Sequence, residues 1–159
     1  MTTRWLDVEQ QQRWRAYIAA TTLLSDRLSR ELQASHGMSI ADYEILVRLS
    51  EATDHQLRMS ELADYTLASR SRLSHQVDRL EKAGWVRREA CETDRRGANA
   101  VLTDLGFDML VAAAPTHVEG VREHLVDLLT EEQFAALGSA LAIVAEHLRS
   151  PEGTAQRSA

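Results

Sequence analysis

The chain has 159 residues, of which 44% are hydrophobic and 26% are charged, and its formal net charge is −6. This length and composition predict one compact domain with a sizeable core and argue against a disordered chain. No apolar run approaches the roughly 18 residues that span a bilayer, and the N-terminal residues lack the apolar core of a secretory signal. We therefore expect a cytoplasmic protein without membrane contact, and the single cysteine, Cys91, agrees with a reducing compartment.

The first helix is predicted from about residue 7 to residue 36. Apolar side chains recur at helical spacing between Trp14 and Leu32, and Gly37 provides a natural stop. A second helix, which Ser39 can cap, is apolar around much of its circumference. This second helix is therefore expected to be buried and to support the segment that follows it.

Residues 59–84 have the pattern of two short helices joined by a turn. Leu62, Ala63 and Leu67 supply apolar contacts for the first helix, Ser69 can cap the second, and Gly84 ends it. The inward face of the second helix carries Leu73, Val77 and Leu80. Its outward face carries hydrogen-bond donors and short polar groups, namely Arg70, Ser71, Arg72, Ser74, His75 and Arg79. Such a face is suited to the major groove of DNA.

A β-hairpin is predicted directly after this helix. Residues 85–90 and 98–102 are prone to form strands, and residues 92–97 between them form an arginine-rich tip. Gly97 gives the tip conformational freedom. A hairpin in this position is a wing that lies beside a major-groove helix.

The arginines of the hairpin are candidates for contacts with DNA. Arg95 and Arg96 are placed to meet backbone phosphates or the adjacent minor groove, and Asp94 is expected to orient one of their guanidinium groups. Arg87 and Arg88 are neighbours on a strand and point to opposite faces, so at most one of them faces DNA. The candidate DNA contacts are therefore Ser69, Arg70, Ser71, Arg72, Ser74, His75, Arg79, Asp94, Arg95, Arg96 and Gly97. For His75 a base, a phosphate and water remain alternative partners.

The distribution of charge agrees with binding to nucleic acid despite the negative total. Between Ser69 and Gly97 eight basic and five acidic residues give +3, which leaves −9 for the remainder of the chain. Positive charge is thus concentrated where DNA is expected, and the acidic remainder disfavours indiscriminate binding. The pattern therefore favours specific binding.

Two further helices are predicted after the hairpin. Thr103 can cap the first, Pro115 is expected to kink or bound it, and Thr130 with Gln133 forms a capping box for the second. Both helices alternate apolar spacings of three and four, which in the second helix are Phe134, Leu137, Leu141, Val144 and Leu148. Such seams require helical partners, and together with the long first helix they present more apolar surface than one subunit covers. A homodimer is therefore expected.

These motifs resemble the MarR family of winged helix-turn-helix transcriptional regulators. The resemblance rests on residues 59–63, on residues 71–84 and above all on Asp-Arg-Arg-Gly at 94–97 running into Leu-Thr at 102–103. It implies a mainly α-helical fold with a small β-hairpin wing, an α+β winged helix-turn-helix flanked by long dimerisation helices. It also implies a homodimer on a pseudo-palindromic operator, repression as the commoner outcome, and often release by a small aromatic or phenolic effector. The expected parts are an N-terminal dimerisation helix, the winged helix-turn-helix, C-terminal dimerisation helices and a mobile tail, at residues 1–36, 37–102, 103–149 and 150–159.

By the same resemblance, an effector would bind between the dimerisation helices and the winged part. The candidate residues are Trp14, Tyr17, Ile18, Tyr43 and Val47, with Arg72 as the partner of a carboxylate. Ordinary core packing is the alternative for every apolar member of this set. Trp5 and Trp14 could equally fasten the first helix to a partner subunit.

Other functions receive less support from the sequence. Cys91 is interpreted as a partly exposed structural residue rather than a redox sensor, because the chain has no second cysteine to resolve an oxidised thiol. His117 and His124, seven residues apart, are interpreted as an interface pair rather than a metal site. The chain lacks a glycine-rich phosphate loop, a nucleophile elbow and a zinc-protease motif, so neither an enzyme nor a cofactor is expected. The alternative function is a winged-helix adaptor that contacts proteins without binding an operator.

Overall fold

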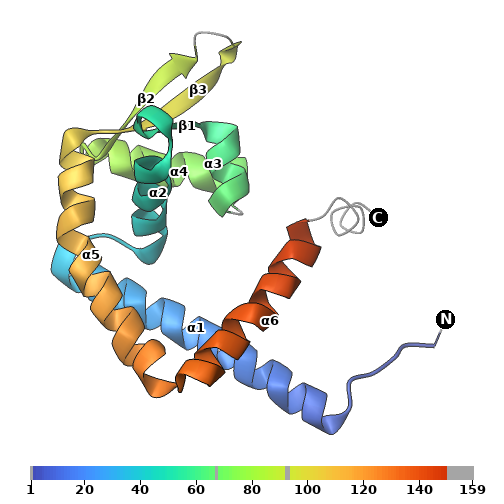
Figure 1. Cartoon of the computed structure of the whole chain (residues 1–159). Helices are drawn as coiled ribbons and strands as arrows, with labels where there is room; N and C mark the ends of the chain where they lie inside the picture. The colour runs from blue at the N-terminus through green and yellow to red at the C-terminus, as the bar shows by residue number, and fades with distance from the viewer. Residues whose placement is uncertain (1, 67, 92–93, 150–159) are drawn as a thin grey trace. The chain divides into compact units, whose positions relative to one another are not determined.

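The structure is a computed structural model in which residues 2–66, 68–91 and 94–149 are described, the side chains of residues 94–96 excepted (Figure 1). The chain forms two compact units, Met1–Gly120 and Val121–Ala159. The described elements are α1 (Val8–His36), α2 (Ile40–Glu51), η1 (Thr53–His55), β1 (Gln56–Arg58), α3 (Met59–Thr66), α4 (Arg70–Lys82), β2 (Val86–Cys91), β3 (Asp94–Leu102), α5 (Asp104–His124), η2 (Val126–Leu128) and α6 (Glu131–Arg149). The predicted mainly helical fold with a small β-hairpin wing is confirmed.

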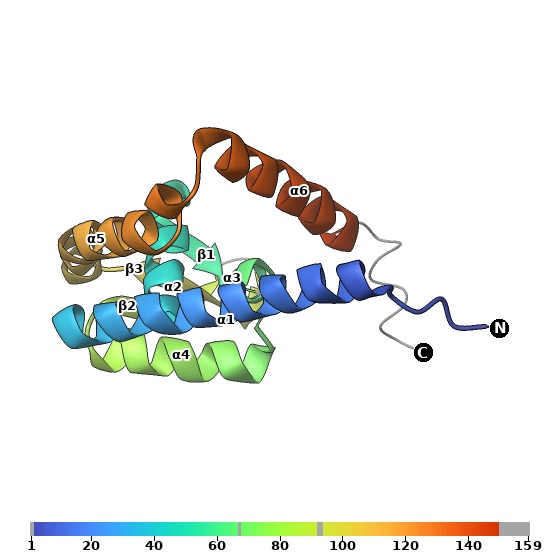
Figure 2. The ribbon, with the colours of Figure 1, turned by 90° about the horizontal axis from the view of Figure 1, so that it is seen from below.

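The long first helix, α1, has bounds close to the predicted residues 7–36, and it ends at Gly37 as predicted. Asp7 and Gln10 form a reciprocal capping box, and Gly37 follows the last turn with φ 68°, its N–H donating to the Gln33 carbonyl. The N-terminal half of α1 is exposed and projects beyond the other elements of the first unit, as both views show (Figures 1 and 2). Only the C-terminal half is packed, where Leu28 and Leu32 are buried.

The hydrophobic core is one cluster to which α2, α3, α4 and β3 all contribute buried residues. Ser39 caps α2 in a second capping box, formed with Asp42, and the helix buries Tyr43, Ile45, Leu46 and Leu49. Leu73, Val77 and Leu80 of α4 are also buried, which confirms the predicted inward face of that helix. The predicted apolar contact of Leu67 lies outside the described residues. Because α2 is central, it supports both the helix-turn-helix and the sheet.

The sheet has three antiparallel strands in the order β1-β3-β2. The hairpin of β2 and β3 was predicted, although β3 begins at Asp94, inside the predicted tip. Strand β1 was not predicted, because three residues are too few to show an alternating pattern. A short turn with positive φ at Asp54 and His55 precedes β1 and brings it alongside β3. The wing is therefore anchored at its base by an additional strand.

Helix α5 follows the wing and packs closely on two neighbours in the first unit. Thr103 caps it as predicted by accepting the N–H of Gly106 at 3.0 Å. Gly106 lies against the carbonyl of Trp85, and Gly120 lies against Leu28 of α1. Pro115 is inside α5 and therefore does not bound the helix.

In the second unit, α6 begins at the predicted capping box of Thr130 and Gln133. Its apolar seam is exposed to a substantial extent, with Phe134 at 40%, Leu141 at 37% and Val144 at 51%. No single helix among the described residues is long and apolar enough to span a membrane. The predicted tail, residues 150–159, lies outside the described residues.

Candidate nucleic-acid interface

Helix α4 presents a polar face to solvent. Ser69 accepts the N–H of Arg72 at 3.2 Å, so the helix begins at its predicted cap. Ser71, Arg72 and His75 are exposed on the side opposite the buried leucines, and the side chain of His75 is 77% exposed. These three side chains are therefore available to a partner outside the chain.

One flank of α4 is attached to α2 by an ion pair. Arg79 donates from Nη2 to Oδ1 of Asp42 at 2.9 Å, and Asp42 also accepts the N–H of Ser39 at 3.1 Å. The Asp42 side chain is only 10% exposed, so Arg79 supplies the charge partner that a buried carboxylate requires. Arg79 was predicted as a DNA contact on its position alone, and the structure adds this intramolecular role.

The other flank of α4 is attached to the wing through Arg88. Its guanidinium donates to Asp78, Glu81 and the carbonyl and hydroxyl oxygens of Ser74. Arg87, its neighbour on β2, instead pairs with the exposed carboxylate of Glu89 at 2.7 Å. The prediction that the two arginines point in different directions is confirmed, and Arg88 is the one that faces the protein.

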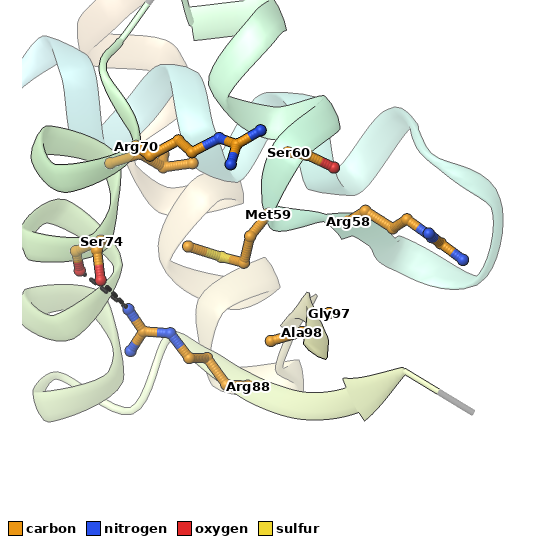
Figure 3. A pocket seen from close by; sticks show the side chains of 9 residues that line it. Arg58, Met59, Ser60, Arg70, Ser74, Arg88, Gly97 and Ala98 are labelled. Atoms are coloured by element: carbon orange, nitrogen blue, oxygen red, sulfur yellow. Dashed lines mark hydrogen bonds between the residues drawn. The ribbon is translucent and has the colours of Figure 1, made fainter. Parts of the chain in front are cut away.

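A pocket of about 530 Å³ opens between the start of α4, the start of α3 and the sheet (Figure 3). Its lining comprises Arg58, Met59, Ser60, Arg70, Leu73, Ser74, Arg88, Gly97 and Ala98. Arg70, Ser74 and Gly97 were predicted as DNA contacts, and the pocket brings them to one place. Arg58 and Ser60 were missed, because their position beside α4 depends on the unpredicted strand β1. The side chains of Asp94, Arg95 and Arg96 lie outside the described residues.

Comparison with known proteins decides the family. A model of the MarR family matches residues 36–97. The HTH-type transcriptional regulator PecS of Dickeya dadantii is 31% identical over 132 residues, which cover 82% of this chain and 79% of PecS. The chain belongs to the MarR family of transcriptional regulators.

Two solved structures of MarR family regulators from Streptomyces coelicolor extend the match over nearly the whole chain. Sco3205, which was solved in complex with DNA, is 52% identical, with a TM-score of 0.91 and coverage of 95% of this chain and 94% of Sco3205. AbsC is 49% identical, with a TM-score of 0.86 and coverage of 92% of this chain and 99% of AbsC. The family fold therefore includes both the winged part and the flanking helices.

The residues predicted to hold a MarR effector occupy several environments. Trp14 and Tyr17 stack at 5.9 Å on the exposed half of α1, where Ile18 is also exposed. Tyr43 is buried, Val47 packs against the core, and Arg72 lies on the exposed face of α4. None of the six residues lines the pocket of Figure 3. Their role in effector binding stays a prediction.

His117 is half-buried in the first unit. Its ring is 4.5 Å from that of Tyr43, and its Nδ1 atom is buried without a hydrogen-bond partner. Burial lowers the pKa of His117 below its ordinary value of 6.5, and the nearby charge of Glu44 opposes this shift in part. No cluster of three or more metal-ligating side chains occurs among the described residues. The predicted pairing of His117 with His124 in a dimer interface stays a prediction.

The burial of His117 predicts a loss of stability in mild acid. Because the pKa is lower in the folded state, the unfolded chain binds more protons as the pH falls through about 6.5, and the free energy of unfolding decreases. We expect His117→Gln to unfold with a weaker dependence on pH between about 7 and 5 than the unsubstituted protein. Urea unfolding across this range measures the effect. Equal slopes for His117→Gln and the unsubstituted protein would contradict this role of His117.

The interpretation of Cys91 as partly exposed was wrong. Cys91 is buried, with only 9% of its surface exposed. It ends β2 and pairs with Asp94 of β3 beyond a register shift. Hairpin pairing of this kind is not visible in the composition of the tip.

Proposed function

We propose that this MarR family regulator binds double-stranded DNA as a homodimer and represses transcription from a pseudo-palindromic operator. In this proposal α4 enters the major groove, and the tip of the wing contacts the backbone or the adjacent minor groove. The observation that carries it is the exposed polar face of α4, with Ser71, Arg72 and His75 directed away from the core. The similarity to Sco3205, solved in complex with DNA, supports the same assignment.

The positions of the two attachments of α4 support the proposal that its exposed face contacts the DNA bases. The buried residues anchor the helix from below, Asp42 attaches one flank and Arg88 attaches the other. A helix restrained on three sides presents its fourth side in a defined orientation. Preorganisation of this kind lowers the entropic cost of binding, because the side chains that contact the bases start from a fixed backbone.

The proposed dimer rests on exposed apolar side chains outside the winged part. On α1 these include Trp5 just before the helix and Trp14 within it, at 84% and 55% exposure, and on α6 they include Leu148 at 61%. Large exposed apolar surfaces of this kind are typical of protein interfaces. A two-fold dimer would place two α4 helices on half-sites about one helical turn apart. Release by a small aromatic effector and a cytoplasmic location complete the proposal.

Substitutions in α4 and in the wing tip should have different consequences. We expect Arg72→Ala, Ser71→Ala and His75→Ala to change which DNA sequence is preferred, because these side chains face the bases. Arg96→Ala, in the tip, should weaken binding to all duplexes about equally, because phosphates carry no sequence information. The measurement is the affinity of each variant for a panel of duplexes at fixed salt.

The same titrations test the proposed function itself. Several phosphate contacts in each subunit should reduce the affinity by orders of magnitude over a few-fold increase in salt concentration. Identical selectivity profiles for the α4 variants and Arg96→Ala would contradict the assigned roles. Absence of duplex binding at low salt would favour the protein-binding adaptor.

A further inference from the structure

Arg88 connects the wing to α4 through an unusually complete set of hydrogen bonds. Its Nη1 atom donates to Oδ1 of Asp78 at 2.7 Å and to Oε2 of Glu81, and its Nη2 atom donates to the Ser74 carbonyl at 3.0 Å and hydroxyl at 3.2 Å. Its backbone N–H donates to Oε1 of Glu81 at 2.8 Å. Figure 3 shows the side chain reaching from β2 across to Ser74. One residue of the wing thus holds three residues of the helix.

The three partners form a single stripe along α4. Ser74, Asp78 and Glu81 are separated by four and three residues, so they share one side of the helix. Ser74 and Glu81 lie beside the buried residues, whereas Asp78 is 47% exposed and its carboxylate lies 4.0 Å from Nδ1 of His75, at the edge of the exposed face. A planar guanidinium with several donors can hold such a stripe in one rotational setting, whereas a single ammonium group cannot.

The attachment is transmitted to the rest of the wing by strand pairing. Arg88 is paired in register with Ala100 of β3, which is fully buried. The register then shifts between Ala90 and Cys91, on the way to the tip. Along β2 towards the tip, Arg88 is therefore the last residue before the register shift whose side chain is shown to hydrogen-bond to α4.

We propose that Arg88 is a positioning residue that fixes the wing against α4 and thereby sets operator selectivity without contacting DNA. This inference rests on the proposed function. The Arg88 side chain is only 25% exposed, and the four oxygen atoms that it contacts occupy its terminal nitrogens. If the attachment is lost, α4 and the tip reach the duplex in variable relative orientations, so contacts that depend on both together are weakened.

The test compares affinities for two duplexes of equal length. One is the sequence that the unsubstituted protein selects from a random library, and the other is a scrambled version of it. We expect Arg88→Met to lower the ratio of the two affinities about tenfold, similar to the effect of one mismatched base pair. Arg87→Met is the matched control, because it removes the same charge from the same strand. A phosphate contact made by Arg87 would strengthen binding to both duplexes alike, so its loss should leave the ratio within about twofold.

A second variant separates positioning from neutralisation of charge. Without Arg88, the carboxylates of Asp78 and Glu81 would repel DNA whatever the position of the wing. The triple variant Arg88→Met/Asp78→Asn/Glu81→Gln removes this repulsion, so affinity for the scrambled duplex should recover while the ratio stays low. Recovery of the ratio in the triple variant would overturn the inference, as would a normal ratio in Arg88→Met.

Two further measurements keep the test informative if a variant is unstable. Arg88→Lys retains the charge but not the planar set of donors, and we expect an intermediate ratio; a normal ratio would show that the guanidinium is not required. Hydrogen exchange should increase in β2 of Arg88→Met while α1 and α2 stay protected. If the unsubstituted protein itself prefers no duplex, the proposed function fails; a preference that Arg88→Met retains refutes only the role of Arg88.

Discussion

Gly106→Ala is expected to destabilise the protein by about 3 kcal/mol, the upper end of the range for overpacked cores. A Cβ atom at Gly106 would lie 2.0 Å from the carbonyl oxygen of Trp85 and 2.9 Å from Cδ1 of Leu102. The oxygen cannot retreat easily, because it accepts the N–H of Thr103 at 3.1 Å where α5 begins. The substitution must therefore displace the first turn of α5 or the end of the α4–β2 connection.

A matched substitution in α6 separates this clash from the general effect of replacing glycine. Apart from its chain neighbours and the backbone of its own helix, no described atom lies within 4 Å of the position that a Cβ of residue 138 would occupy. Gly138→Ala should stabilise the protein by about 0.5–1 kcal/mol, because alanine favours helix over glycine. Urea unfolding followed by circular dichroism measures both variants. A Gly106→Ala variant as stable as the unsubstituted protein would show that α5 does not approach Trp85 this closely.

The double substitution Leu141→Glu/Val144→Glu is expected to produce monomers and to weaken operator binding by at least about a hundredfold. Both side chains belong to the exposed apolar seam of α6, and two carboxylates there would be buried without partners in a dimer. A dimer gains affinity because the second half-site is bound at high effective concentration, and that gain is lost in a monomer. Light scattering gives the mass, and duplex titration gives the affinity.

Ser139→Glu is the control for added negative charge, because position 139 is exposed on the opposite side of α6 from the seam. It should leave both the mass and the affinity close to those of the unsubstituted protein. A double variant that remains dimeric would place the interface elsewhere. A monomeric double variant that binds the operator as tightly as the unsubstituted protein would contradict the claim that dimerisation increases affinity.

The helix boundaries could be predicted because their signals are local. Asp7, Ser39, Ser69 and Thr130 each lie within three residues of the backbone group that they cap, so a short stretch of sequence contains the whole interaction. The inward face of α4 could also be predicted locally, because the spacing of its apolar residues follows from the period of this one helix. The predicted caps and the predicted inward face of α4 are both found in the structure, because the tertiary packing does not override these local preferences.

The attachments of α4 could not be predicted because their partners are distant in the chain. Arg79 and Asp42 are 37 residues apart, and Arg88 meets Ser74 only because the chain reverses after α4. In the sequence both arginines look like members of one basic segment. Only the fold distinguishes those that pair within the protein from Arg72, on the exposed face of α4.

The central claim is that two copies of the chain read two related half-sites of a duplex. Selection of bound sequences from a random duplex library by the unsubstituted protein tests it most directly. We predict enrichment of an inverted repeat whose arms are separated by about one helical turn, roughly 10 base pairs. Enrichment of no sequence, or of a single arm without its inverted partner, would contradict the claim.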